Sequence, residues 1–167
     1  FEAETRVEVR PSLVAGFGVF ATRDCSSNEV LTVYPADFLS LRTATRGADG
    51  VLQSMLFWRS ANEGIAPPTW RGELVDYKLV ALMADGISIM GDPDVAPPGR
   101  CGHLINDARG TNFAYNCANV YLLDGVCNVI VATCHIKAGE ELFLPYGEAY
   151  WNEKHASRQS SNAGQHH

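Results

Sequence analysis

Three short segments of this 167-residue chain gather residue types that commonly form ligand sites: glycine, asparagine, aspartate and tyrosine. In the first segment, Gly16 and Gly18 flank Phe17, so the backbone can press closely against a ligand or another strand. A tight hairpin explains the same pattern, and for an isolated pair of glycines it is the better interpretation. No strand–GxGxxG–helix unit follows, so the segment does not predict a dinucleotide-binding fold.

The second segment is Gly102–Ala108 (GHLINDA), and it continues after an interval at Asn116–Val120 (NCANV). The side chain of Asn106 has both amide donors and a carbonyl acceptor, so it can hold irregular backbone or a ligand. A turn and a ligand site explain this pattern equally well. His103 has no acid or second metal ligand at a recognisable spacing, and we interpret it as non-catalytic.

The third segment is Gly139–Trp151 (GEELFLPYGEAYW). A tyrosine that precedes a glycine at the end of a strand places its phenol at a backbone turn, where it can enter a pocket. A final strand followed by aromatic residues that pack on the core explains the pattern as well. Residue chemistry alone leaves both interpretations open.

Composition restricts the class of protein. Apolar residues make up 46% of the chain and charged residues 19%, which is typical of one soluble globular domain. There is no apolar run of about 20 residues and no signal-peptide core at the N-terminus, so we expect neither a membrane span nor secretion. The net charge of −6 disfavours direct binding of nucleic acid and is compatible with a Lys/Arg-rich protein partner. The oligomeric state is not indicated.

The cysteines predict reduced intracellular thiols, because they are odd in number and scattered: Cys25, Cys101, Cys117, Cys127 and Cys134. No two of them have CxxC spacing, so a zinc site is not expected. Cys127 and Cys134 lie on an apolar run, which predicts that both are buried.

Short strands must position these segments. Strand patterns occur at residues 7–9, 19–20, 29–34, 77–83, 87–90, 119–123, 126–133 and 141–144. The strongest hairpin signal is Asp124-Gly125. Between about Asp37 and Trp58, the helical spacing of Leu52, Met55 and Leu56 predicts one short helix. The predicted class is mostly β with few short helices.

Taken in order, the three segments resemble the SET domain of protein-lysine methyltransferases. GFGVFA is similar to the family's G-x-G-v-x-A element, LINDA with NCANV to (F/I)-I-N-H-S-C-x-P-N-C, and GEELFLPYG to G-E-E-L-x-x-x-Y-G. The resemblance implies small curved sheets with knot-like threading of the C-terminal segment. It also implies a SET domain over residues 1–152, a variable insert at 36–100 and a disordered tail at 153–167.

The resemblance also implies roles for individual residues. Those implied to bind S-adenosyl-L-methionine are Gly16, Phe17, Gly18, Asn106, Asp107 and Trp151. Tyr146 matches the catalytic tyrosine, and Tyr34 matches a tyrosine that lines the lysine channel. Tyr77 matches another aromatic of the substrate pocket. Leu144 stands where many members carry the aromatic residue that limits how many methyl groups are added.

Three features depart from the family pattern. Asp107 replaces the usual histidine, Ala108 replaces the usual serine, and an insertion at Arg109–Tyr115 separates the two halves of the second motif. Because the cysteine-rich segments that flank some family members are missing from this sequence, structural zinc is not expected.

The function implied is transfer of a methyl group to a lysine of a basic protein or peptide, with a histone tail as the expected partner and the nucleus as the expected location. Two alternatives remain open. Asp107 and Leu144 favour a SET-like binding module with weak or no activity, against which the retained Tyr146 argues. A plain β-rich interaction domain would bind no S-adenosyl-L-methionine.

Overall fold

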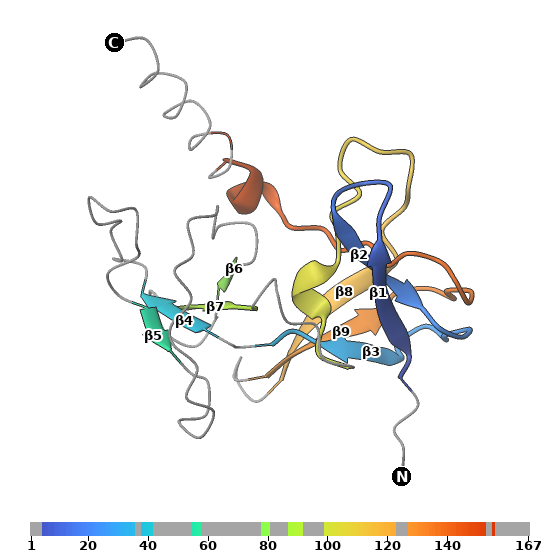
Figure 1. Cartoon of the computed structure of the whole chain (residues 1–167), viewed down its shortest axis with the longest axis horizontal. Helices are drawn as coiled ribbons and strands as arrows, with labels where there is room; N and C mark the ends of the chain where they lie inside the picture. Colours follow the sequence, from blue (N-terminus) through green and yellow to red (C-terminus); the bar gives the residue numbers. More distant parts are fainter. Residues whose placement is uncertain are drawn as a thin grey trace.

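The computed structural model describes residues 5–35, 38–41, 55–57, 78–80, 87–91, 99–122, 127–152 and 155. Within these residues the chain is mostly β, as predicted, with three small antiparallel sheets (Figure 1). The same residues contain one 3-10 turn, η2 (Gly102–Leu104), and an α-helical turn at 148–152. None of the described helices is long and apolar enough to cross a membrane.

The first sheet is the hairpin of β1 (Val7–Pro11) and β2 (Phe17–Ala21). Its turn closes through a hydrogen bond from the Ser12 N–H to the Gly16 carbonyl at 2.9 Å. Gly16 has a φ of 46°, a left-handed conformation that glycine adopts without steric cost. The predicted strand–turn–strand is confirmed.

The second sheet has the order β3-β9-β8, made of β3 (Val30–Val33), β8 (Cys117–Leu122) and β9 (Cys127–Ala132). Six residue pairs align β8 with β9, which confirms the hairpin predicted there. The Asp124-Gly125 turn itself lies outside the described residues. Ile130, at the centre of β9, is completely buried, so this sheet forms one wall of the core.

The third sheet has the order β5-β4-β7-β6, with β4 (Phe38–Leu41), β5 (Met55–Phe57), β6 (Lys78–Val80) and β7 (Ile87–Met90). The strands predicted near β6 and β7 are confirmed. The predicted helix is wrong at Met55 and Leu56, which pair with β4 as a strand. Sheet hydrogen bonds to a neighbouring strand outweigh the helical spacing of a short apolar run. Leu52, most of the 36–100 region and Tyr77 lie outside the described residues.

The segment that follows β9 passes between two parts of the chain. On one side the Leu142 N–H donates to Val19 of β2, at 2.8 Å. On the other side the Leu144 N–H donates to Asn106 at 3.0 Å, and Phe143 forms a parallel bridge with Asn106. The continuous strand predicted at 141–144 is therefore wrong: the residues form single bridges to alternating neighbours. Leu142 is completely buried, so this threading runs through the core.

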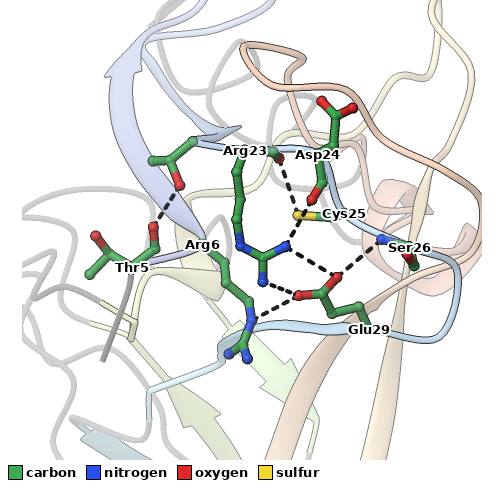
Figure 2. Close-up of polar contacts among 8 residues, drawn as sticks. Thr5, Arg6, Arg23, Asp24, Cys25, Ser26 and Glu29 are labelled. Atoms are coloured by element: carbon green, nitrogen blue, oxygen red, sulfur yellow. Dashed lines mark hydrogen bonds and ion pairs between the residues drawn. The ribbon is translucent and has the colours of Figure 1, made fainter. Parts of the chain in front are cut away.

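An ion cluster joins the N-terminal hairpin to the start of β3 (Figure 2). Glu29 accepts hydrogen bonds from the guanidinium groups of Arg6 and Arg23, the former at 2.9 Å, and from the Ser26 N–H at 3.0 Å. These contacts, of which the bond from Arg23 contributes most, lower the pKa of Glu29 to about 2. The cluster fixes the turn between β2 and β3.

All five cysteines are free thiols, as predicted. Cys25, Cys101 and Cys117 are buried, and burial raises the pKa of the Cys117 thiol to about 12, so it is unreactive at neutral pH. The prediction that both Cys127 and Cys134 are buried is wrong. Cys127 is half-buried, and Cys134 is exposed because β9 ends two residues before it.

Candidate functional site

The three segments singled out in the sequence meet at a pocket of about 460 Å³. This volume lies within the range of roughly 300–1,000 Å³ typical of small-molecule sites. The hairpin turn between β1 and β2, the region around η2 and the C-terminal segment each contribute part of the wall. The lining residues are Val14, Ala15, Gly16, Phe17, His103, Leu104, Asn106, Asp107, Arg109, Thr111, Tyr146, Tyr150 and Trp151.

Asn106 attaches the hairpin turn to the C-terminal segment. Its side-chain amide donates to the carbonyls of Ala15 and Phe17, at 3.2 and 3.1 Å, and to Glu141 Oε1 at 3.1 Å. A Cβ on Gly18 would lie 2.1 Å from that same Glu141 oxygen, so a larger residue there would displace the Glu141 carboxylate from Asn106. The glycines therefore form a hairpin, and the turn of that hairpin is also a pocket wall.

The Asp107 carboxylate accepts four hydrogen bonds from other described residues. Its Oδ1 accepts from the Arg109 N–H and the Tyr115 hydroxyl, both at 2.7 Å. Its Oδ2 accepts from the Tyr146 N–H at 2.9 Å and from the Trp151 indole N–H at 3.0 Å. Burial acts to raise the pKa of this carboxyl, but the hydrogen bonds together outweigh it and hold the pKa below its usual value. Asp107 is therefore ionised at neutral pH.

An aromatic cluster, made of Tyr146, Tyr150 and Trp151, closes one side of the pocket. The Tyr146 and Trp151 rings are nearly parallel, with centroids 6.4 Å apart. Tyr150 meets both edge-on, at 4.6 Å from Tyr146 and 5.1 Å from Trp151. The Tyr146 hydroxyl donates to the Ile105 carbonyl at 2.6 Å, which fixes the phenol at the wall.

Other predicted site residues lie outside the pocket wall. Tyr34 is buried at the end of β3, with its ring edge-on to His103 at 6.3 Å, and only His103 of the two lines the pocket. The His103 ring lies against Gly91, where a Cβ would come within 2.2 Å of it. Leu144 is buried in the hydrophobic core. Their predicted roles toward a substrate stay predictions.

The sequence predicts no role for several residues that belong to this site, among them Arg109, Thr111, Tyr115 and Tyr150. The first three lie in the insertion between the two halves of the second motif. Tyr150 carried a usable signal, because it lies within the third segment and directly precedes Trp151. Arg109 lies at the rim, where it pairs with Glu148 at 3.0 Å and stacks its guanidinium over Trp151 at 5.5 Å.

Comparison with known proteins agrees with this geometry. The SET domain family model matches residues 16–147, which include the first two segments and the third as far as Gly147. No curated protein matches the chain, whereas 211 chains of solved structures do. One is a crystal structure from Plasmodium falciparum, described as a "putative histone methyltransferase". It is 16% identical, covers 89% of this chain and 98% of its own, and superposes with a TM-score of 0.52, which shows the shared fold. The chain belongs to the SET domain family.

Proposed function

We propose that this chain is a protein-lysine methyltransferase that uses S-adenosyl-L-methionine. The observation that carries the proposal is the position of Tyr146. Its phenol is fixed by Ile105 at the wall of the pocket in which the three SET segments meet. A pocket of small-molecule size beside a fixed phenol is what a methyl donor and a lysine side chain require together.

The residues present fit this cofactor. The turn at Gly16 and Phe17 offers backbone polar groups, and Phe17 remains 62% exposed beside them. Tyr150 and Trp151 offer aromatic surface for an adenine ring. The ionised Asp107 makes the pocket favourable for a molecule that carries a sulfonium and an ammonium group. When bound, S-adenosyl-L-methionine supplies an electrophilic methyl group.

The chain itself must supply a neutral lysine amine in the correct orientation. A free lysine has a pKa of about 10.4, so its nucleophilic form is scarce at neutral pH. Apolar and aromatic walls, among them Tyr146 and the predicted channel residue Tyr34, desolvate the ammonium and lower its pKa. The hydrogen bond from Tyr146 to Ile105 keeps the phenol in a single orientation toward the amine. Water takes the proton, so no side chain needs to act as a strong base.

A histone tail is the substrate we propose, in keeping with an intracellular and nuclear protein. The net charge of −6 attracts a Lys/Arg-rich peptide. The similar solved structure is itself described as a "putative histone methyltransferase", which supports the same class of partner.

The experiment that tests the proposal is replacement of Tyr146 by Phe. We expect turnover to fall by at least about 100-fold, because the phenol oxygen and its fixed orientation are both lost. Methylation is measured by mass spectrometry on a panel of histones and lysine peptides incubated with S-adenosyl-L-methionine. Tyr121→Phe makes the same chemical change on β8, outside the pocket lining, and should leave turnover unchanged. Near-normal turnover in Tyr146→Phe overturns the assignment.

The second candidate is a SET-like module that binds S-adenosyl-L-methionine without turnover. Two observations favour it: Asp107 replaces the family histidine, and Leu144 lies in the core instead of the pocket wall. Calorimetry separates the candidates, because this module would bind the cofactor while the whole substrate panel stayed unmethylated.

A further inference from the structure

The carboxylate of Asp107 has used its acceptor capacity inside the protein. An ionised carboxylate offers about four lone-pair positions. Asp107 fills them with two backbone N–H groups, a phenol and an indole. A ligand in the pocket therefore finds no vacant acceptor on Asp107, and the residue acts on the ligand through its four partners and its charge.

Those partners come from two parts of the chain that belong to the pocket. Arg109 and Tyr115 are the two ends of the insertion, whereas Tyr146 and Trp151 belong to the aromatic cluster. Arg109, Tyr146 and Trp151 all line the pocket. A movement of Asp107 would therefore displace both walls together.

We propose that Asp107 is a positioning residue that ties the 109–115 insertion and the aromatic cluster into one wall of the cofactor pocket. The identity of the ligand rests on the proposed function, whereas the positioning role rests on the contacts alone. The aspartate and the insertion, two separate departures from the family pattern, are then one structural unit: the insertion delivers two of the four donors that the aspartate requires.

The chemistry of the four partners explains why a carboxylate is needed. The N–H groups of Arg109, Tyr146 and Trp151 can only donate, and Tyr115 alone has a hydroxyl that can also accept. An asparagine would turn its NH₂ group toward one of the two pairs and oppose at least one N–H donor. A neutral histidine ring, the usual family residue, has a single acceptor nitrogen and could serve one of the four.

The test compares Asp107→Asn with Asp24→Asn, which makes the same change at an exposed carboxylate that accepts the Ala138 N–H at 2.9 Å and lies 3.8 Å from His135 Nε2. One readout is the indole N–H resonance of Trp151, identified by its disappearance in Trp151→Phe. The other is the dissociation constant of S-adenosyl-L-methionine, measured by calorimetry. We expect Asp107→Asn to shift the indole resonance and to weaken binding at least about tenfold, and Asp24→Asn to change neither.

If Asp107→Asn does not fold, Tyr115→Phe decides the question, because the Tyr115 side chain is largely at the surface and only its hydroxyl is removed. We then expect a smaller indole shift and binding weakened about threefold. An unchanged resonance together with unchanged binding, in whichever of the two variants folds, overturns the proposal. A wild-type chain that fails to bind S-adenosyl-L-methionine defeats the proposed function instead, and the indole shift still decides the positioning role.

Discussion

Glu29 and Asp107 are two carboxylates of the same fold that each collect several hydrogen-bond donors, yet the donors differ in charge. Glu29 lies between two arginines at the surface, so its charge is neutralised where it stands (Figure 2). Asp107 is buried and accepts only from neutral groups: two backbone N–H groups, a phenol and an indole. Two carboxylates that accept a similar number of hydrogen bonds therefore have different surroundings and, we expect, different roles.

The two carboxylates differ in whether their charge can act on a ligand in the pocket. The Glu29 cluster is a polar staple between β1, β2 and β3, in which the Glu29 carboxylate lies within hydrogen-bond distance of two opposite charges. The charge of Asp107 has only Arg109 as a nearby cation among the pocket-lining residues, and that arginine is paired with Glu148. The aspartate therefore makes the pocket negative, which favours a cationic ligand.

Replacement of each carboxylate by alanine should separate these roles most strongly. Asp107→Ala removes the carboxylate oxygen that accepts from the Tyr146 N–H and the Trp151 indole N–H. We expect the free energy of unfolding to fall by about 3 kcal/mol and methyl transfer to fall at least about 100-fold. Urea unfolding and the mass-spectrometric assay measure the two quantities.

Glu29→Ala is the matched change at the staple. It should lower the free energy of unfolding while the turnover of the folded protein stays at the wild-type value, because Glu29 is not part of the pocket lining. A loss of turnover as large as that of Asp107→Ala would show that both carboxylates serve the reaction. The distinction between a structural Glu29 and a pocket Asp107 would then be wrong.

Acid should weaken the contacts of both carboxylates, because protonation removes the negative charge. A different measurement detects the loss at each of them. The folded-state pKa of Glu29, about 2, lies below its ordinary value of 4.5. Its contribution to stability is therefore complete above about pH 4.5 and is lost as the pH falls toward about 2. Urea unfolding of Glu29→Gln should consequently show a flatter decline than wild type over that interval. Glu8→Gln, at an exposed ion pair on β1, serves as the control.

The same sign holds for Asp107, whose pKa lies below its ordinary value of 3.8. The Trp151 indole resonance should thus keep its neutral-pH position until the pH falls below about 3.8, where protonation of Asp107 begins. The His155 ring lies 6.5 Å from the Trp151 ring, so the measurement is made in the His155→Gln background. A shift of that resonance between about pH 5 and about pH 8 in this background would mean that the carboxyl is not held in its charged form.

The sequence predicted the features that depend on residues close together along the chain. The hairpin around Gly16 and the β8–β9 pair follow from turn residues and alternation, which act over a few positions. The resemblance of three motifs to one family placed Asn106 and Tyr146 in a common site, and the structure brings both to the pocket.

What the sequence could not predict depends on partners that are distant along the chain. Met55 lies in a strand only because β4 pairs with it, and residues 141–144 are not a regular strand because their neighbours alternate. Two of the four donors on Asp107, the Tyr146 N–H and the Trp151 indole N–H, come from 39 and 44 positions away, so no local pattern reveals them. Tyr115 is only eight positions from Asp107, but the path of the insertion that brings its hydroxyl to the carboxylate has no pattern of its own in the sequence.

A smaller effect on stability is expected from salt, which should act differently on Glu29 and on Asp107. Raising the salt from about 0.05 M to about 1 M shortens the Debye length from more than 10 Å to about 3 Å. The destabilisation caused by Glu29→Gln should shrink with salt, because its partners are partly exposed cations. The destabilisation caused by Asp107→Asn should stay nearly constant, because its partners are neutral donors. Urea unfolding at both salt concentrations gives the two differences, and equal salt sensitivity would contradict the distinction.

The smallest effect is expected at the rim, for Glu148→Gln. The Glu148 side chain is 76% exposed, and exposed ion pairs contribute about 0–1 kcal/mol, so the free energy of unfolding should change by less than about 0.5 kcal/mol. The substitution does remove the counterion of Arg109, whose guanidinium stays near Trp151 and opposes the charge of Asp107. Affinity for a cationic cofactor should therefore fall about twofold at low salt and recover at about 1 M salt. Calorimetry at the two salt concentrations measures this change. A loss that persisted at high salt would mean that Glu148 contacts the ligand directly instead of acting through the field around Asp107.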